Sequence, residues 1–338
     1  MSRVGVIGEG KMGTNLFHYI AGFPFDMCWV VSHNADLEKI RKGWSKKVLR
    51  GLNTGIIDTE QAARMEKAII SDDIHILSGC DLVIEAITED PELKQNLFRL
   101  IDPVIPPSAI LSTNSSSILP SALIPSERRS ERTIGLHFFY PVGIKNIVEM
   151  IVTGTTSKAT VDAAQEFLAG IGRKWLLQDE PNAFVLNRIF LEFQAEAFAI
   201  VSEGILTPAQ VDDLVRTRLF PLGPFECVDA VGTDVMVPAI RNYILTYPDR
   251  HRYNALLTAL KAMQLEGRLG VKSGRGFFNY RPDAPAEADL PLPISENVAG
   301  IVESRLMKAY DGAIARFSVN APYGRDELLT AMDEYLGR

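Results

Sequence analysis

The stretch Val4-Gly5-Val6-Ile7-Gly8-Glu9-Gly10-Lys11-Met12-Gly13 decides the fold of this chain. Val4 to Ile7 predict a short buried strand, and the apolar periodicity from Lys11 to Gly22 predicts a helix directly after it. The glycines between them have the spacing Gly-x-Gly-x-x-Gly. In that setting the first glycine allows a tight turn, the second lets a diphosphate approach the backbone, and the third lets helix and strand pack closely. A glycine-rich turn without a ligand is the alternative, but the flanking strand and helix favour dinucleotide binding.

Short apolar runs and helical stretches alternate through the rest of the first part of the chain. The predicted strands are Cys28–Val31, Ala68–Ile70, Asp81–Ile87 and Ala109–Ser112, and the predicted helices begin at Asn34–Asp36, running to about Leu52, and at Asp58. Such alternation predicts a parallel sheet covered by helices on both faces. We therefore expect an α/β fold, with a doubly wound, Rossmann-type sheet over residues 1–180.

The later part of the chain has helical patterns only. These are Ala183–Ser202, a helix beginning at Thr207-Pro208, Val235–Tyr247 and Asn254–Glu266, and they predict an all-α domain over residues 181–280. Residues 281–338 contain a linker, Arg281–Pro293, and two more helical patterns, Val298–Ala315 and Arg325–Leu336. Because Phe184–Phe190 resembles Ile301–Met307, this extension is either a degenerate repeat of the helical domain or a chance likeness between amphipathic helices.

Composition excludes several classes of protein. The length of 338 residues fits about two domains, and 46% hydrophobic and 23% charged residues exclude a disordered chain. With 35 basic and 42 acidic residues, the net charge of −7 argues against a nucleic-acid binder. Three scattered cysteines without a CxxC pair argue against a disulfide framework or zinc cluster and fit a reducing, cytoplasmic setting; no metal is expected. There is no apolar run of about 18 residues for a membrane span, and the N-terminal run leads into the glycine motif rather than a signal peptide.

The end of the second predicted strand leaves the choice of dinucleotide open. An acid about twenty residues after the glycine turn normally holds the adenosine ribose, but here the strand ends in Ser32-His33-Asn34. Ser32 can hydrogen-bond a ribose hydroxyl, or it can accept a 2′-phosphate with His33, Lys39 or Arg41 nearby. Since no arginine stands at the strand tip, we expect NAD, with NADP not excluded.

A basic helical stretch follows that strand and contains Lys39, Arg41, Lys42, Lys46, Lys47 and Arg50. Positions 39, 42, 46 and 50 fall close to one face of a helix. A solvated face is one interpretation. The other is a binding surface for a substrate that carries a phosphorylated handle.

His137 and Glu149 are the polar residues that stand out most. His137 is one of only five histidines and lies in Gly135-Leu136-His137-Phe138-Phe139, and Glu149 lies inside the apolar run Ile147–Ile151. A buried carboxylate is costly unless it is paired, so we expect the two to satisfy each other on neighbouring strands. A packed core histidine is the alternative, but an imidazole that faces a carboxylate makes a good general base near neutral pH.

Three further polar features follow predicted strands or interrupt a helix. Ser112–Ser117 follows a strand, where hydroxyls can orient a substrate oxygen or simply cap a turn. Asn187 lies inside an apolar helix and needs a polar partner, either a substrate oxygen or a backbone group. Glu85 ends a strand, near the cofactor or as a cap for the next turn.

Taken together, these motifs resemble the L-3-hydroxyacyl-CoA dehydrogenase family, in particular 3-hydroxybutyryl-CoA dehydrogenases. The matching segments occur in family order over about residues 3–280: the glycine turn, Val83–Ala86, Thr113–Ser116, Gly135–Phe139, Val148-Glu149, Phe184–Arg188, Pro221–Glu226 and Lys272–Phe278. The resemblance implies an NAD(P)-dependent enzyme of fatty acid metabolism that interconverts (S)-3-hydroxyacyl-CoA and 3-oxoacyl-CoA. It also implies a homodimer, and neither nucleic acid nor membrane is expected as a partner.

The resemblance also assigns roles to residues. His137 would take the 3-hydroxyl proton, Glu149 would orient it, and Ser116 and Asn187 would hydrogen-bond the substrate oxygen. The implied cofactor contacts are Gly8, Gly10, Met12, Gly13, Ser32, Glu85 and Asn114, and the implied CoA contacts are Lys46, Lys47 and Arg50.

Three departures from the family pattern keep alternatives open. Ser32 replaces an acid, Tyr140 stands where the family usually has Asn before Pro141, and the chain extends beyond Tyr280. One alternative is a dehydrogenase of a free hydroxy acid, such as a sugar acid or carnitine. The other is a non-catalytic dinucleotide-binding or structural protein, since some relatives serve as lens crystallins.

Overall fold

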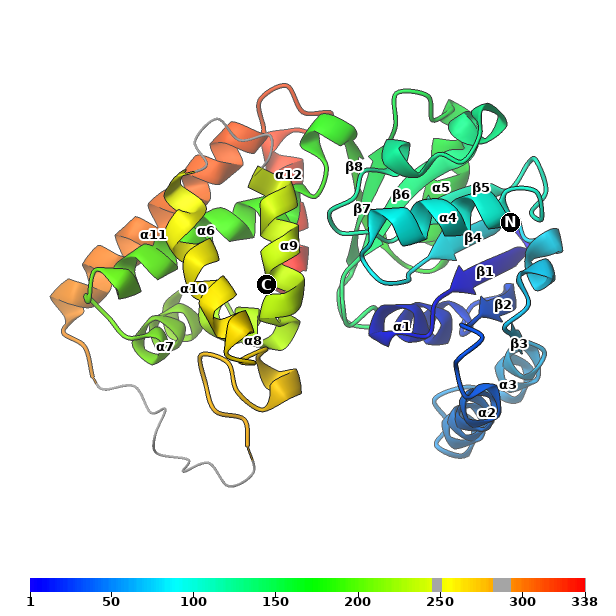
Figure 1. The fold of residues 1–338 in the computed structure, drawn as a ribbon, viewed down its shortest axis with the longest axis horizontal. Helices are drawn as coiled ribbons and strands as arrows, with labels where there is room; N and C mark the ends of the chain where they lie inside the picture. The colour runs from blue at the N-terminus through cyan, green and yellow to red at the C-terminus, as the bar shows by residue number, and fades with distance from the viewer. Residues whose placement is uncertain (245–250, 282–292, 338) are drawn as a thin grey trace. The chain divides into compact units, whose positions relative to one another are not determined.

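The computed structural model describes residues 1–244, 251–281 and 293–337, and the chain divides into two units, Met1–Ala183 and Phe184–Arg338. Figure 1 shows the strands in the first unit and helices in the second. The last residues of the predicted helix Val235–Tyr247 and most of the predicted linker Arg281–Pro293 lie outside the described residues.

The first unit alternates strands with helices. Its strands are β1 (Arg3–Ile7), β2 (Asp26–Val30), β3 (Ile69–Ser71), β4 (Leu82–Glu85), β5 (Ile110–Thr113), β6 (Thr133–Phe138), β7 (Ile147–Val152) and β8 (Lys174–Asp179). Its α-helices are α1 (Lys11–Ile20), α2 (Leu37–Asn53), α3 (Thr59–Glu66), α4 (Pro91–Ile101) and α5 (Lys158–Gly170). Short 3-10 helices are η1 (Ile74–Gly79), η2 (Pro120–Leu123), η3 (Glu127–Arg132) and η4 (Glu180–Asn182).

These strands form one sheet of eight, in the order β3-β2-β1-β4-β5-β6-β7-β8. Neighbouring strands run parallel from β3 to β6, whereas β7 runs antiparallel to β6 and parallel to β8. The predicted doubly wound α/β sheet is confirmed, with one difference: the sheet is not parallel throughout. The reversal at β7 has no local sequence signal, because a strand buried on both faces reads the same in either direction.

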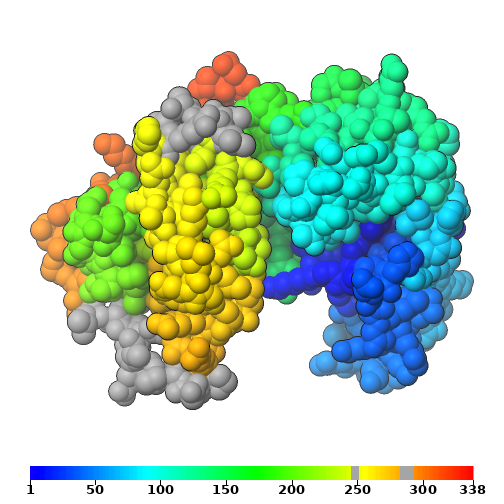
Figure 2. All heavy atoms as spheres, viewed as in Figure 1, coloured from blue at the N-terminus to red at the C-terminus, as the bar shows by residue number. Residues whose placement is uncertain are grey.

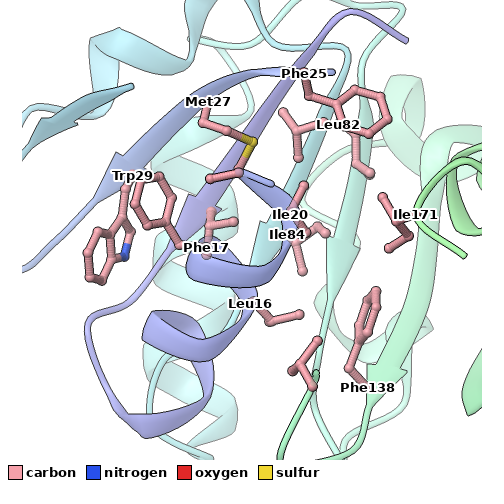
Figure 3. Packing of buried hydrophobic residues seen from close by; sticks show 14 of the residues in the cluster. Leu16, Phe17, Ile20, Phe25, Met27, Trp29, Leu82, Ile84, Phe138 and Ile171 are labelled. Atoms are coloured by element: carbon pink, nitrogen blue, oxygen red, sulfur yellow. The ribbon is translucent and has the colours of Figure 1, made fainter. Parts of the chain in front are cut away.

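Two apolar cores, one on each face of the sheet, hold the first unit together. Residues of α1, α2, α3 and α5 pack on one face, and η1 and α4 pack on the other. Figure 3 shows the larger core, where Phe17 of α1 lies against Trp29 of β2 and Leu82 and Ile84 of β4 lie nearby. The rings of Phe17 and Trp29 are stacked with centroids 4.5 Å apart. The core therefore fixes α1, and with it the glycine turn, on the carboxyl end of β1.

The glycine turn depends on close backbone approach. Gly8 has φ +112°, and a Cβ there would lie 2.6 Å from the carbonyl oxygen of Ala86. A Cβ on Gly13 would lie 2.2 Å from the carbonyl oxygen of Gly8, whereas a Cβ on Gly10 would meet nothing within 4 Å. Gly8 and Gly13 are therefore required for packing, and Gly10 leaves the backbone open on its outer side.

The second unit is helical and centres on a long buried helix, α6 (Val185–Ser202). The others are α7 (Pro208–Arg218), α8 (Pro224–Val231), α9 (Thr233–Ile244), α10 (Asn254–Leu265), α11 (Glu296–Phe317) and α12 (Arg325–Leu336), with 3-10 helices η5 (His251–Tyr253) and η6 (Val271–Ser273). In Figure 2 the side chains of α9 and α10 (yellow-green to yellow) lie side by side, and these helices contact each other. Helix α11 packs along α6, where the Arg305 guanidinium lies 2.7 Å from carboxylate oxygens of both Glu196 and Glu203.

Two sequence motifs of the second unit, Pro221–Glu226 and Lys272–Phe278, have a structural role. Asp212 accepts hydrogen bonds from the backbone of Phe225 and Glu226 at the start of α8, and a Cβ on Gly223 would lie 2.2 Å from its Cγ. Burial raises the pKa of Asp212 to about 7, against the effect of these hydrogen bonds. Asp229 likewise accepts from the backbone of the segment that follows η6, so these motifs stabilise the helical unit.

Among the described residues, no helix is both long enough and apolar enough to cross a membrane.

The glycine turn gives the first prediction. Gly13→Ala should lower the free energy of unfolding by about 1–3 kcal/mol, because its methyl group must displace the Gly8 carbonyl. Gly10→Ala is the matched control and should unfold like the unchanged protein. Urea denaturation followed by circular dichroism measures both, and equal stability of the two variants would contradict the packing role of Gly13.

Candidate active site

The carboxyl ends of β1, β4, β5 and β6 meet at one edge of the sheet, because these strands are parallel. From β1 the sheet continues through β2 and β3 on one side and through β4 on the other. Open α/β sheets bind ligands at such a switch point, outside the carboxyl ends of the strands. The glycine turn follows β1, Glu85 ends β4, Thr113 ends β5 and His137 lies one residue before the end of β6. The polar residues predicted from the first part of the sequence therefore gather at this edge.

His137 and Glu149 face each other across the antiparallel pair β6–β7. They are register partners, and His137 Nδ1 lies 2.7 Å from Glu149 Oε2. The side chain of His137 is 6% exposed and that of Glu149 is fully buried. Because the carboxylate accepts the proton of Nδ1, Nε2 becomes the basic nitrogen of the ring. The predicted pairing of the two side chains is confirmed.

A second residue fixes the carboxylate of Glu149. Gln178 of β8 is buried, and its Nε2 donates to Glu149 Oε1 at 2.9 Å. Each oxygen of Glu149 thus has a partner on a different neighbouring strand, so the carboxylate has little freedom to turn away from the imidazole. Nothing in the spacing of the sequence pointed to Gln178.

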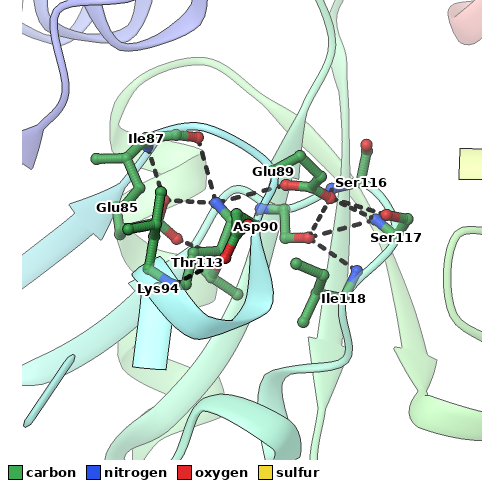
Figure 4. Close-up of polar contacts among 11 residues, drawn as sticks. Glu85, Ile87, Glu89, Asp90, Lys94, Thr113, Ser116, Ser117 and Ile118 are labelled. Carbon is green, nitrogen blue, oxygen red and sulfur yellow. Dashed lines mark hydrogen bonds and ion pairs between the residues drawn. The ribbon is translucent and has the colours of Figure 1, made fainter. Parts of the chain in front are cut away.

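The turn after β5 is organised by Glu89, a residue that the sequence analysis missed. Glu89 Oε1 accepts hydrogen bonds from the backbone nitrogens of Ser116 and Ser117 and from the hydroxyls of Ser115 and Ser117. Figure 4 shows its carboxylate directed at this turn. Burial opposes the ionisation of Glu89, but the ammonium of Lys94 and the serine hydrogen bonds outweigh it and hold the pKa below its usual value. The backbone that carries Ser116 is therefore held by a charged residue of the β4–α4 loop.

Glu85, at the end of β4, forms a buried ion pair with Lys94 of α4. Lys94 Nζ is 2.5 Å from Glu85 Oε1, and the two side chains are 1% and 0% exposed. Thr113 donates its hydroxyl to Glu85 Oε2 at 2.7 Å, and the backbone nitrogen of Ile87 donates to Oε1. The carboxylate thus joins β4, β5 and α4 and has internal partners for both oxygens. Lys94 lies on the buried face of α4 together with Phe98 and Ile101. Predicting a helix over residues 91–101 would have placed this lysine on the apolar face.

The glycine turn fits a bound dinucleotide. The backbone at Gly10 is open, and the N-terminus of α1 has no side-chain cap, so its first N–H groups can receive a diphosphate. Met12 lies in the first turn of α1 and is partly buried. Asn114 is held by its own side chain, whose Oδ1 accepts from the backbone nitrogen of Phe138 at 2.9 Å. At the tip of β2, the Ser32 hydroxyl donates to Glu9.

The loop after β6 is also joined to the glycine turn. Tyr140, the residue that departs from the family pattern, is 46% exposed. The ammonium of Lys11 lies over its ring, 4.3 Å from the centroid. A cation–π contact of this kind places the aromatic ring beside the first turn of α1.

Three lysines of α2 border a hollow of about 410 Å³. Its lining residues are Asp36, Glu38, Lys39, Lys42, Gly43 and Lys46. Lys42 is paired with Glu38 at 2.6 Å. Lys47 and Arg50 are exposed on the same helix but are not among the lining residues. Burial, assisted by the charge of Lys47, lowers the pKa of His18 on α1 to about 4. The lining of the hollow thus includes two acids, Asp36 and Glu38. Of the predicted CoA contacts, Lys46 borders it, whereas Lys47 and Arg50 do not.

Asn187 belongs to the second unit and lies inside the apolar helix α6, as expected, in its first turn. Its Nδ2 donates to the hydroxyl of Tyr243 at 3.0 Å, and its Oδ1 accepts from the hydroxyl of Tyr335 at 3.2 Å. The expected polar partner is therefore present, but it is a pair of tyrosines from α9 and α12. Phe184 has a left-handed backbone, so α6 begins at Val185, two residues after the predicted start at Ala183.

Comparison with known proteins identifies both units. The model of the 3-hydroxyacyl-CoA dehydrogenase NAD binding domain matches residues 3–180, and that of the C-terminal domain of the same enzyme matches residues 184–280. The chain is similar to 3-hydroxybutyryl-CoA dehydrogenase of Bradyrhizobium diazoefficiens, with 30% identity over 290 residues, covering 84% of this chain and 97% of the relative.

Solved structures agree with that likeness. The crystal structure of FadB2 from M. tuberculosis matches with a TM-score of 0.76 and 29% identity, covering 83% of this chain and 99% of that one. A second structure, of the NAD+-dependent dismutase FHMPC 5-dehydrogenase, matches with a TM-score of 0.63 and 26% identity, covering 92% and 97%.

The sequence motifs, the sheet with its glycine turn and the two family models all agree. The chain belongs to the 3-hydroxyacyl-CoA dehydrogenase family.

Proposed function

We propose that this protein catalyses the reversible, NAD-dependent oxidation of an (S)-3-hydroxyacyl-CoA to the 3-oxoacyl-CoA, as a step of fatty acid metabolism. The observation that carries the proposal is the buried His137–Glu149 pair at the edge of the sheet that also carries the glycine turn. The similarity to 3-hydroxybutyryl-CoA dehydrogenases supports the substrate class.

His137 is the proposed general base. Its Nδ1 donates to Glu149, so Nε2 is the nitrogen that would take the proton of the 3-hydroxyl group as the C3 hydrogen leaves with its electron pair. In the reverse direction the same nitrogen would return the proton to the carbonyl oxygen. Glu149 is a positioning residue that holds the ring and stabilises the imidazolium. Bound NAD supplies the hydride acceptor, and the chain supplies position and the base.

Ser116 and Asn187 are the proposed hydrogen-bond donors to the substrate oxygen. The backbone of Ser116 is fixed through Glu89, and the side chain of Asn187 is fixed by Tyr243 and Tyr335. Such fixed donors act by orientation, because they need not reorganise when the substrate binds. We assign the exposed lysines and arginine of α2, namely Lys46, Lys47 and Arg50, to the phosphates of CoA.

The helices beyond Tyr280 are the least characteristic part of the chain. We propose that α11 and α12 are a degenerate copy of part of the helical domain, since Ile301–Met307 of α11 resembles Phe184–Phe190 at the start of α6. A homodimer, and a cytoplasmic location suggested by three free cysteines, belong to the same proposal.

A free hydroxy acid is the second candidate substrate. The FHMPC 5-dehydrogenase that resembles this chain is named for a pyridine carboxylic acid without CoA. Tyr140 beside Lys11 also gives this chain a bulkier residue at the loop after β6 than the usual asparagine.

His137→Gln should reduce kcat by roughly 10²–10⁴-fold, because glutamine cannot take the hydroxyl proton. Dinucleotide affinity, measured by calorimetry, should stay unchanged. The control is His75→Gln, which changes an exposed histidine of η1 that pairs with Asp73. Normal turnover by the His137 variant would remove the proposed base.

Glu149→Gln keeps the shape of the side chain but removes the charge that stabilises the imidazolium. We expect kcat to fall by roughly 10²-fold or more while KM for the acyl substrate changes little. Steady-state kinetics measure the split. Glu166→Gln on the exposed face of α5 is the control, and a rise in KM alone would argue against the positioning role.

The CoA moiety is tested with a panel of (S)-3-hydroxyacyl-CoA thioesters of increasing chain length and the corresponding free 3-hydroxy acids. We expect kcat/KM to be at least about 10²-fold higher for the thioesters, because the phosphates add binding energy remote from the reacting carbon. Equal or better turnover of the free acids would favour the second candidate.

A further inference from the structure

A carboxylate from another part of the chain lies beside the tip of β2, although the residues that directly follow this strand include no acid. The side chain belongs to Glu9, the residue between the first two glycines of the turn. Glu9 Oε1 accepts the Ser32 hydroxyl at 2.6 Å, and Glu9 Oε2 accepts the Ser32 backbone nitrogen at 3.1 Å. The position after the strand, where this fold normally has its acid, is thus filled from the preceding turn.

The backbone of the turn is fixed independently of that contact. The backbone nitrogen of Gly8 donates to the carbonyl of Val30 at 2.9 Å, and Trp29 Nε1 donates to the carbonyl of Gly8 at 2.8 Å. The carbonyl of Glu9 accepts the hydroxyl of Thr14 at 3.0 Å. Because β2 and α1 both hold the turn, the carboxylate does not depend on Ser32 alone for its position.

We propose that Glu9 is the residue that selects NAD over NADP, by accepting hydrogen bonds from the adenosine ribose diol and repelling a 2′-phosphate. A carboxylate can accept about four hydrogen bonds, and Ser32 supplies one to each oxygen of Glu9. Capacity therefore remains on both oxygens for the ribose hydroxyls. A 2′-phosphate at the same place would stand next to the Glu9 carboxylate, so two anions would repel each other. The phosphate would also replace the ribose 2′-hydroxyl, which is one of the hydrogen-bond donors to Glu9.

The surrounding charges favour the same choice. His33 pairs with Asp72 at 3.0 Å, and Arg41 donates through Nε and Nη2 to the carbonyl of Ile70. Two of the three candidates for holding a 2′-phosphate, His33 and Arg41, are therefore engaged with β3 and its following residue. Asp36, which caps α2, adds a further negative charge next to Lys39.

The inference rests on the NAD-dependent chemistry proposed above, but it concerns the cofactor only. Its test uses dinucleotides without any acyl substrate, so a wrong substrate assignment would leave it intact. The probes are NADH, NADPH, ADP-ribose and 2′-phospho-ADP-ribose, each titrated into the whole 338-residue chain by isothermal calorimetry.

Glu9→Gln keeps the size of the side chain and removes the charge. We expect the ratio of NADPH to NADH dissociation constants to fall by about tenfold or more, with the same trend for the ADP-ribose pair. In the unchanged protein the preference for NADH should weaken as salt is raised, because salt screens the repulsion of the 2′-phosphate. The Glu9→Gln variant should lose most of this salt dependence.

Two further variants separate charge from position. Ser32→Ala keeps the carboxylate and should keep the preference for NADH. Glu9→Ala combined with Ser32→Asp moves the carboxylate onto the strand and should restore the preference that Glu9→Ala loses. Glu38→Gln, which removes an exposed charge from α2, is the control and should leave the ratio within about twofold.

The opposite results would overturn the inference. If Glu9→Gln melts at a lower temperature but binds NADPH no better relative to NADH, Glu9 is only a structural link between the turn and β2. If Glu38→Gln shifts the ratio as much as Glu9→Gln, the preference reflects general surface charge and not this carboxylate.

Discussion

The hydrogen bond between His137 and Glu149 is the interaction on which the candidate site depends. It exists because β7 runs antiparallel to β6 with the two residues in register, and because β8 then brings Gln178 to the other carboxylate oxygen. A buried carboxylate without partners would be costly. The reversal of the sheet at β7 thus gives the buried carboxylate of Glu149 its partners, and the carboxylate in turn fixes the imidazole of His137. Both side chains stand on strands and not on a loop.

The rest of the site follows the same pattern, in which one buried or partly buried acid holds a neighbouring element. Glu85 joins α4 to β4 and β5 through Lys94, and Glu89 holds the turn after β5. Glu9 links the glycine turn to the tip of β2. These acids bind backbone nitrogens and hydroxyls, so the loops at the edge of the sheet keep a defined geometry without a large apolar core of their own.

The sequence predicts features whose signals are local. The strand, turn and helix of β1 and α1 follow from one continuous stretch, Val4–Gly22, and the pairing of His137 with Glu149 follows from the cost of burying each. The role of Glu9 was not foreseen, because its partner Ser32 lies 23 residues away and only the register of β1 with β2 brings them together. Glu89 and Lys94 were missed with helix α4, and the first-turn position of Asn187 depends on one left-handed residue, Phe184.

The burial of Lys94 has a chemical consequence for an enzyme that handles thioesters. Thioesters acylate neutral amines that they can reach, and an acylated lysine loses its charge. Lys94 is 1% exposed and its Nζ lies 2.5 Å from Glu85 Oε1, so an acyl donor cannot reach the nitrogen. The lysine that supports the sheet edge is thereby protected from slow damage by the substrate, whereas the exposed lysines of α2 have no such protection.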